Sequence, residues 1–561
     1  MVSLHRLPGV AAAFERARAE RWAERLLDRD TSLWSDDPHV REAIADRLGW
    51  LDAPAHFAGQ IAALEGFGEG IREAGFRTAV VMGMGGSSLA PEVLYRTFGS
   101  GDGWLDVRVL DSTDPLAVSR TVDDLDPLST LWIVASKSGT TTEPLAFQAD
   151  AWARLEATLE LRGSSQGPGE FMIAITDPRR SEAAIPHHDD LREVFLNPPD
   201  IGGRYSALSY VGLVPASLIG LDLDALLSSA ATMLARCSDP DPEANPGLSL
   251  GLAIGALAGA GRDKLTLVAD PAIASFGAWV EQLIAESTGK HGVGIVPVDL
   301  EPLGDVDAYG PDRVFVRLRV AGGDPHPGDL TVDALEAAGQ PVIRTEIEDP
   351  IELGGEFVRW EVATAIAGVV LRIDPFDQPN VEEAKDRTRQ VLAAVGGGES
   401  PPPIDAAAVP LAIDDPATLE ALRRHLARRR DDAYLALQAF VAPSPAADAA
   451  LARIRHRLRD ATRCATTAGY GPRFLHSTGQ LHKGGPPSGW FLQLVSEHIH
   501  ERDIPGWPYT FGQLIDAQAR GDFESIVAHD LPILRLDLGS DVEAGLGRLE
   551  RALKRALESG S

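Results

Sequence analysis

The sequence predicts an α/β protein with two doubly wound parallel sheets and helical N- and C-terminal segments. Apolar runs of strand length alternate with helical patterns over residues 71–240, and the alternation starts again at residue 264. A Pro/Asp-rich linker at residues 238–246 separates the two units, and the segment GGGESPPP at residues 396–403 follows the second. The chain has 561 residues, which is enough for two or more domains with a large core.

The apolar runs assign the strands of each unit. In the first unit, we predict strands at residues 78–82, 107–110, 130–135, 171–176 and 194–195. In the second unit, we predict strands at residues 264–269, 294–298, 314–320 and 341–343, followed by a helix at 357–371. Beyond residue 403, the pattern predicts one strand at 434–441 and an Arg-rich helix at 446–460.

The chain is therefore expected to divide into four segments. Residues 1–57 form a helical N-terminal segment, residues 58–240 the first α/β domain and residues 241–395 the second. Residues 396–561 are expected to complete the second domain and the active site. This last segment carries a loop at residues 469–489 that is dense in Gly, His and Lys.

Composition limits the partners and the compartment. A formal net charge of −30 disfavours nucleic acid and anionic membrane surfaces as partners. Cys237 and Cys464 are too few for a disulfide framework and indicate free thiols in a reducing compartment. The N-terminus lacks a signal-peptide core, and no apolar stretch reaches the roughly 20 residues of a membrane span. We therefore expect a soluble, cytoplasmic protein.

Two turns rich in Gly, Ser and Thr follow predicted strands. The first contains Gly83, Gly85 and Gly86, which allow the backbone to approach a ligand closely. The second, SKSGTTTE at residues 136–143, offers several hydroxyls and one lysine. A strand, a tight turn and a helix N-terminus present backbone N–H groups to an anion, so the two turns are predicted to face one pocket. The alternative is that each is an ordinary turn with a helix cap.

The first turn also partly matches a dinucleotide-binding fingerprint. Asp111 ends the next predicted strand, as the fingerprint's acidic residue would. Ser88, however, occupies the place of the third glycine. Dinucleotide binding is therefore the weaker interpretation of this turn.

Two motifs combine charged and polar residues suited to proton transfer. Arg204 follows a glycine pair, which would let its guanidinium lie close to a ligand. Glu286 lies in AESTGKHG (residues 285–292), beside hydroxyls and Lys290, after a helix that contains Gln282. A base that moves a proton between carbon atoms needs a carboxylate whose pKa is set by burial and neighbours. Taken alone, each motif also fits a turn or a helix end.

Two later motifs add further candidates. The segment IDPFDQPNVEEAK (residues 373–385) places Gln378 at a turn and Lys385 in the helix that follows. The loop LHSTGQLHKGG (residues 475–485) contains His476. It has no Cys or carboxylate at metal-ligand spacing, which favours acid–base or phosphate chemistry over zinc. We therefore expect no zinc site in this loop.

Together these motifs resemble those of the glucose-6-phosphate isomerase family. GMGGSSLAP, ASKSGTTTE, GGRYS, ESTGK and FDQPNVEEAK occur in the family's order between residues 78 and 385. The loop LHSTGQLHKGGP is most similar to the isomerase part of fused transaldolase/glucose-6-phosphate isomerase proteins, although the chain has no room for the transaldolase barrel. The resemblance implies two SIS-type α/β sandwiches with helical arms. It also implies a carbohydrate-binding enzyme of glycolysis and gluconeogenesis that needs no metal and no cofactor. The implied enzyme is a homodimer with its site near the interface.

The resemblance also implies a role for each motif residue in interconverting glucose 6-phosphate and fructose 6-phosphate through a cis-enediolate. Glu286 would move the proton between C2 and C1, Arg204 would stabilise the enediolate, and His476 and Lys385 would open the sugar ring. Gln282 and Gln378 would hold the substrate. The implied phosphate ligands are Ser87, Ser136, Lys137, Ser138 and Thr141.

The chain departs from the family pattern in a few places. Asn380 stands where the FDQ motif usually continues with glycine, and Ser138 and Gly139 replace bulkier residues. The LHSTGQ loop follows the ESTGK and FDQ motifs instead of lying between them, where this chain has Asp307. We nevertheless expect His476 to complete the site of the neighbouring subunit, as the family's ring-opening histidine does. Dual activity on mannose 6-phosphate and a non-catalytic sugar-phosphate regulator are the alternative functions.

Overall fold

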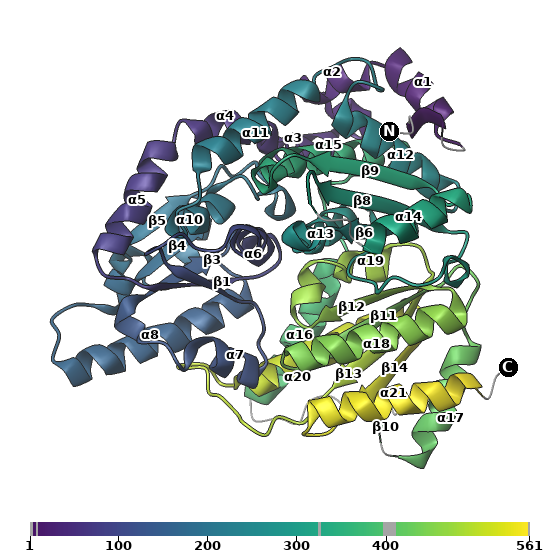
Figure 1. Ribbon diagram of the computed structural model, residues 1–561. Coiled ribbons are helices and arrows are strands. Elements are labelled where there is room, and N and C mark those ends of the chain that lie inside the picture. The colour runs from purple at the N-terminus through teal and green to yellow at the C-terminus, as the bar shows by residue number, and fades with distance from the viewer. Residues whose placement is uncertain (1–3, 7–8, 324–326, 397–410, 414, 559–561) are drawn as a thin grey trace.

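The computed structural model describes residues 4–6, 9–323, 327–396, 411–413 and 415–558. The described chain forms three parallel β-sheets, with helices packed against them (Figure 1). The predicted α/β class with doubly wound parallel sheets is confirmed. The third sheet was not predicted. Most of the segment at residues 396–403 lies outside the described residues.

The first sheet has the strand order β2-β1-β3-β4-β5, and every neighbouring pair is parallel. Its strands are β1 (Thr78–Gly83), β2 (Asp106–Leu110), β3 (Thr130–Ala135), β4 (Met172–Thr176) and β5 (Glu193–Leu196). The chain moves outward from β1 in one direction to β2 and in the other through β3, so the order reverses between β1 and β3. Ligands of open α/β sheets bind in the crevice at such a reversal, beyond the carboxyl ends of the strands.

The second sheet has the order β7-β6-β8-β9 and is also parallel. Its strands are β6 (Lys264–Ala269), β7 (Val296–Val298), β8 (Arg313–Val320) and β9 (Val342–Ile347). Phe315 and Val316 alternate between two hydrophobic clusters on opposite faces of the sheet. This alternation is expected for a sheet covered on both faces. The predicted strands of both units are confirmed, most with shifts of one or two residues at their ends.

The third sheet has the order β10-β14-β13-β11-β12. Its strands are β10 (Leu411–Ala412), β11 (Tyr434–Phe440), β12 (Ala465–Tyr470), β13 (Gly489–Val495) and β14 (Ile533–Asp537). Leu437, Leu492 and Leu536 belong to a hydrophobic cluster of their own, separate from the main core. Strands β10 to β14 therefore form a further sheet instead of extending the second one. The four predicted segment boundaries stay predictions.

Helices cover the sheets and connect their strands. The N-terminal helices are α1 (Ala11–Ala19), α2 (Trp22–Leu27), α3 (Pro38–Ala45), α4 (Ala53–Ala58) and α5 (Ile61–Glu73). The helices of the first unit are α6 (Gly86–Phe98), α7 (Pro115–Val122), α8 (Thr142–Arg162), α9 (Arg180–Ala184), α10 (Tyr210–Leu218) and α11 (Leu223–Arg236). Those of the second unit are α12 (Pro246–Gly259), α13 (Phe276–Thr288), α14 (Pro327–Ala337) and α15 (Leu353–Leu371).

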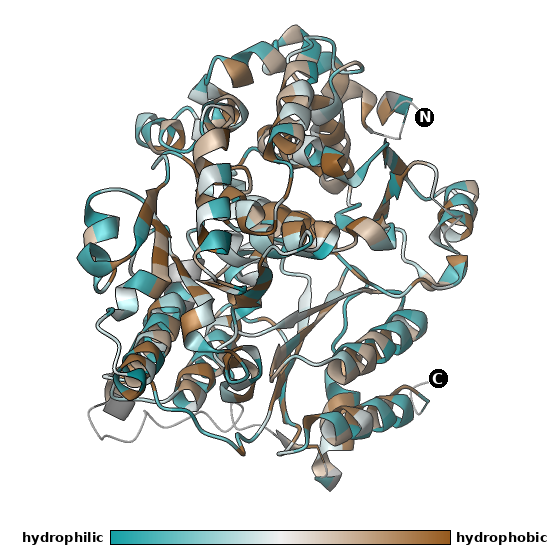
Figure 2. Cartoon of the chain, turned by 60° about the vertical axis from the view of Figure 1, so that its left-hand side comes forward, coloured by the Kyte–Doolittle hydropathy of each residue, from teal (hydrophilic) through white to brown (hydrophobic). Residues whose placement is uncertain are grey.

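The remaining helices lie around the third sheet. They are α16 (Val381–Gly396), α17 (Pro416–Ala427), α18 (Pro445–Thr462), α19 (Gly479–Gly484), α20 (Phe511–Ala528) and α21 (Val542–Glu558). Helices α6, α13 and α19 lie near the middle of the molecule, where the three units meet (Figure 1). Apolar residues run along the strands, and polar residues cover the outer faces of the peripheral helices (Figure 2). None of the helices in the described part of the chain is long and apolar enough to cross a membrane.

Candidate active site

A cavity of about 840 Å³ opens beyond the carboxyl ends of β1 and β3, where the first sheet reverses its strand order. Every predicted site residue lines it. These residues are Ser87, Ser136, Lys137, Ser138, Thr141, Arg204, Gln282, Glu286, Gln378, Lys385 and His476. They come from all three units of the chain. Asp307, which stands at the family's usual place for the histidine loop, is not among the lining residues.

The two Gly/Ser/Thr turns form one wall of this cavity. The first leads into α6 at Gly86 and the second into α8 at Thr142, so two helix N-termini face the cavity. The Ser136 hydroxyl donates to Thr141 Oγ1 at 3.2 Å. A Cβ atom at Gly86 would collide with the carbonyl oxygen of Gly203, so only glycine permits this close approach. This wall can bind an anion such as a phosphate group.

Lys137 adds a positive charge to the same wall. Its ammonium group pairs with Asp177 and donates to the Pro199 carbonyl oxygen at 3.0 Å. Burial raises the pKa of Asp177, while the hydrogen bond and charge of Lys137 oppose that shift. The side chain of Lys137 is 31% exposed, so the ammonium group can also reach a bound anion.

Arg204 is buried and rigidly held. Its Nε donates to Ser287 Oγ at 2.7 Å, and its Nη2 donates to the carbonyl oxygens of Pro375 and Asp377 at 2.8 and 2.9 Å. Its Nη1 lies 3.6 Å from Glu286 Oε1 and donates to the Gln378 side chain at 3.0 Å. The guanidinium is therefore fixed before any ligand arrives, which is the condition for electrostatic stabilisation of developing negative charge.

Glu286 lies on α13 with its side chain 13% exposed, so the carboxylate is mostly shielded but remains accessible from the cavity. Gln282, one helical turn earlier, donates to Glu286 Oε2 at 3.3 Å. The same amide donates to the carbonyl oxygen of His476 at 2.7 Å. Gln282 thus joins the candidate base to the loop that carries the candidate ring-opening histidine.

Lys290 holds the turn that positions Arg204 and Gln378. Its buried ammonium group donates to the Asp374 carbonyl oxygen at 2.5 Å and pairs with Asp377 Oδ1 at 2.6 Å. Burial and the nearby charge of Arg204 lower the pKa of Lys290 to about 8. Lys290 does not line the cavity, so its contribution is to keep the turn in place.

His476 lines the cavity of its own chain, from the 3-10 helix Arg473–His476. Its Nε2 lies 3.1 Å from Glu143 Oε1, and Gln518 donates to the same carboxylate oxygen at 2.7 Å. The structure thus places His476 in the cavity of its own chain, whereas the expectation that it completes a neighbouring subunit's site stays a prediction. This placement follows from the third sheet: the histidine loop follows β12, and this unit packs against the first one, where Thr113 donates to Gln518 at 2.7 Å.

Glu143 and Gln518 are functional candidates that the sequence did not reveal. Glu143 ends the ASKSGTTTE motif, but an acidic residue in the first turn of a helix usually only offsets the helix dipole. Burial alone would raise the pKa of Glu143, but the charge and hydrogen bond of His476 bring it below its usual value. The carboxylate is therefore ionised and fixes the orientation of the His476 ring. The sequence signal for Gln518 is weaker: it is a polar residue on the buried face of helix α20.

Lys385 and Lys483 bring two further ammonium groups to the cavity. Lys385 is exposed on α16 and lines the cavity beside Thr388. Lys483 is buried on α19, and its Nζ lies 2.8 Å from Asp522 Oδ1. Among the described residues, no group of three or more His, Cys, Asp or Glu side chains could hold a metal ion.

The fold and this cavity define a doubly wound α/β protein whose site can bind an anionic small molecule beside an acid–base pair. A family model described as phosphoglucose isomerase matches residues 28–297. Glucose-6-phosphate isomerase of Symbiobacterium thermophilum is 31% identical over 433 residues, which cover 68% of this chain and 92% of that protein. The chain belongs to the phosphoglucose isomerase family.

Other relatives agree with this assignment. Glucose-6-phosphate isomerase of Rubrobacter xylanophilus is 28% identical, with 62% of this chain and 90% of that protein covered. A hypothetical protein from Thermus thermophilus superposes with a TM-score of 0.58 at 27% identity, covering 69% of this chain and 98% of that one. A glucose-6-phosphate isomerase from Chlamydia trachomatis shares the fold, with a TM-score of 0.51 at 21% identity, over 71% of this chain and 81% of that one. The third sheet lies beyond the residues that the family model matches.

Proposed function

We propose that this protein is a glucose-6-phosphate isomerase, which reversibly converts glucose 6-phosphate into fructose 6-phosphate through a cis-enediolate. The observation that carries the proposal is the pair of Glu286 and the fixed Arg204 guanidinium, 3.6 Å apart in the cavity that also holds the Ser/Thr turns. Proton transfer next to a carbonyl needs a base, and the resulting oxyanion needs a fixed positive charge. Glu286 supplies the base and Arg204 the positive charge.

We assign each group of lining residues a separate role in the reaction. The phosphate group binds Ser87, Ser136, Lys137, Ser138 and Thr141, which places the sugar carbons deeper in the cavity. Glu286 removes the proton from C2 and returns it to C1, while Arg204 stabilises the enediolate oxygens. Gln282 and Gln378 hold the substrate hydroxyls.

Ring opening comes before this proton transfer. Glu143 binds Nε2 of His476, so the other ring nitrogen of His476 can exchange a proton with the sugar ring oxygen. Lys385 assists from α16. All of these groups lie in one chain, so the proposed homodimer is not needed to complete the cavity. We place the reaction in the cytoplasm, where the buried free thiols Cys237 and Cys464 would stay reduced.

A dual phosphoglucose/phosphomannose isomerase would use the same residues, because the stereochemistry at C2 depends on the shape of the cavity. Assaying mannose 6-phosphate beside fructose 6-phosphate separates these two functions. A non-catalytic sugar-phosphate regulator needs only the phosphate wall. The grouping of Glu286, Arg204 and His476 around the same cavity favours an enzyme over this third candidate.

The test is a coupled assay on fructose 6-phosphate with EDTA present, using wild type and Glu286→Gln. The glutamine keeps the shape of the side chain and removes the base, so we expect kcat to fall on the order of 10²–10⁴-fold. Glu281→Gln is the matched control on the same helix. Burial raises the pKa of Glu281 to about 8, so glutamine replaces a side chain that is mostly neutral at pH 7. Turnover near the wild-type value in Glu286→Gln would refute the mechanism.

A further inference from the structure

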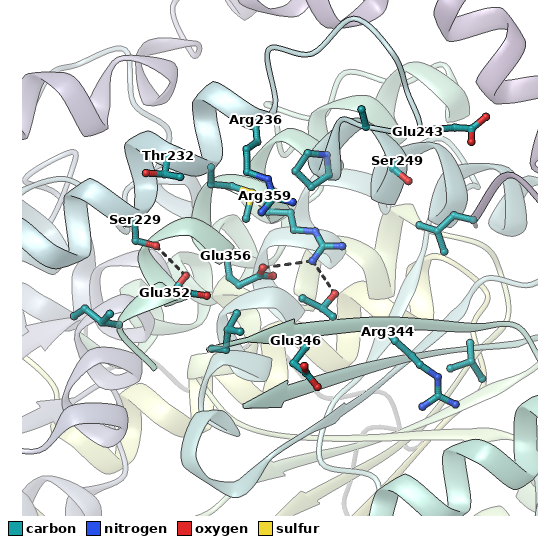
Figure 3. A pocket seen from close by; sticks show the side chains of 18 of the residues that line it. Ser229, Thr232, Arg236, Glu243, Ser249, Arg344, Glu346, Glu352, Glu356 and Arg359 are labelled. Carbon is teal, nitrogen blue, oxygen red and sulfur yellow. Dashed lines mark hydrogen bonds and ion pairs between the residues drawn. The ribbon is translucent and has the colours of Figure 1, made fainter. Parts of the chain in front are cut away.

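A second cavity of about 670 Å³ shares no lining residue with the catalytic cavity. It is lined mainly by α11, the start of α12, the edge strand β9 and the first two turns of α15 (Figure 3). Its volume lies in the range of small-molecule sites, roughly 300–1,000 Å³. Nothing in the proposed isomerase reaction uses it.

One face of α11 is directed toward this cavity. Ser229, Thr232, Met233 and Arg236 line it, and their spacing of three and four residues places them on one side of the helix. The Arg236 side chain extends from the end of α11 into the same part of the cavity as Arg359 of α15 (Figure 3). Two guanidinium groups directed at one space favour an anion between them.

Two buried groups that line the cavity have incomplete bonding, and a third, exposed group has no ion-pair partner. Within the described chain, Arg236 forms no ion pair. Arg359 Nη1 donates to Thr345 Oγ1 at 2.7 Å and to Glu356 Oε1 at 3.4 Å, but its buried Nε has no partner. Glu356 is only 2% exposed, and its Oε2 atom also has no partner. A buried donor and a buried acceptor are thus left to a ligand or to water.

Most other charged residues around the cavity have ion-pair partners. Arg344 pairs with Glu336 at 2.7 Å, Glu346 lies 3.7 Å from Arg319, and Glu243 lies 3.8 Å from Arg18. Glu352 also lines the cavity and forms no ion pair with any described residue. Arg359 and Glu356 lie close enough to offset each other, so Arg236 offers a positive charge without an ion-pair partner. A single negative charge on the ligand balances it. A phosphate dianion would bring excess negative charge next to Glu356.

We infer that this cavity binds a small hydroxylated monocarboxylate of the sugar-acid type. The ligand carboxylate accepts hydrogen bonds from Arg236 and from Arg359 Nε, in the forked geometry that arginine offers to carboxylates. A ligand hydroxyl donates to Glu356 Oε2, and further hydroxyls contact the Ser229 and Thr232 side of the cavity. The site is separate from the catalytic cavity and does not depend on the isomerase proposal.

The test measures binding by titration calorimetry with four probes: D-gluconate, sorbitol, hexanoate and inorganic phosphate. We expect gluconate to bind once per chain. Sorbitol lacks the carboxylate and hexanoate lacks the hydroxyls, so each should bind at least about 10-fold more weakly, as the loss of a charge-assisted or buried hydrogen bond predicts. Inorganic phosphate should bind only at the catalytic cavity, and Ser136→Ala should weaken phosphate binding without changing gluconate binding.

Variants identify the site. Arg236→Gln should weaken gluconate binding on the order of 10-fold or more, because it removes the uncompensated charge from an exposed position on α11. Arg551→Gln, at an exposed position on α21 remote from the cavity, removes the same charge and should leave gluconate binding unchanged. The inference is overturned if wild type shows no saturable gluconate binding, if Arg236→Gln binds gluconate like wild type, or if sorbitol or hexanoate binds as well as gluconate. The comparison of probes needs only wild type, so it holds even if a variant fails to fold.

Discussion

Mixing two inactive variants tests whether the catalytic cavity belongs to one chain. Glu286→Gln removes the candidate base, and His476→Ala removes the candidate ring-opening group. In the structure, Gln282 of the same chain connects the two residues, at 3.3 Å from Glu286 and 2.7 Å from the His476 carbonyl oxygen. Each variant chain therefore carries a defect in its own cavity, whatever its partner.

The two arrangements predict very different activities. If each cavity is built from one chain, every cavity in a mixed sample keeps one defect, and activity stays at the mean of the two parents. The kcat of each parent variant should be lower than that of wild type on the order of 10²–10⁴-fold, which is the usual contribution of a general acid or base. If His476 served a neighbouring subunit, about half of randomly mixed dimers would contain one intact site. Activity would then return to about a quarter of wild type.

The assay is the coupled isomerase reaction after co-expression of the two variants with different affinity tags. Tandem purification isolates mixed assemblies, and a chain carrying both substitutions sets the background. Each purified mixed dimer would contain one intact site of two if His476 served its neighbour, so recovery toward half of wild-type activity would refute the one-chain cavity. If the purified protein proves to be monomeric, wild-type activity per chain should not change on dilution, and a loss on dilution would contradict the one-chain cavity.

Three further predictions concern stability and substrate binding. Burial raises the pKa of Glu361 well above its usual value, so between the usual and the raised pKa the folded state holds a proton that the unfolded state has released. Stability should therefore fall as pH rises through that window, by up to about 1.4 kcal/mol per pH unit. Glu361→Gln should remove this fall, and parallel melting curves of the two proteins from pH 5 to 8 would disprove it. Changing Ser136 and Thr141 together to Ala should raise KM and weaken inorganic phosphate binding with little change in kcat, whereas a loss of NAD binding instead would favour the dinucleotide alternative. Leu492 is fully buried in the central strand β13, so Leu492→Ala should lower the free energy of unfolding by about 2–5 kcal/mol. Urea titration measures this change. A decrease below about 1 kcal/mol would contradict a separate packed core in the third unit.

The first two sheets could be predicted because buried parallel strands read as continuous apolar runs. The runs at β1, β3 and β6 begin at the predicted residues and end within one residue of the predicted ends. The third sheet was predicted in this way only at β11, although β13 (GWFLQLV) is also a buried, largely apolar run. Its strand β12 reads ATTAGY, without an apolar run, and β10 has only two residues. Such strands are fixed by their neighbours in the sheet rather than by their own pattern.

The location of the site was predictable from the positions of its motifs along the predicted strands and helices. The motifs around Ser136 and Glu286 lie at ends of strands or helices, where side chains of different segments meet. The placement of His476 in the cavity of its own chain could not be predicted, because it depends on how the third unit packs against the first. That packing rests on contacts between residues hundreds of positions apart, such as Thr113 with Gln518. No local pattern encodes such a contact.

The division of the cavity among three units has a consequence during synthesis. Ribosomes add roughly 5–20 residues per second, so the stretch after Glu286 takes on the order of ten to fifty seconds to emerge. During this time the first two sheets can fold, while the surface around Gly289 and Gly294, which later packs against Leu481, stays uncovered. His476 and Gln518 arrive only near the end of the chain. An incomplete chain therefore carries the proposed phosphate wall and base without His476, the proposed ring-opening group.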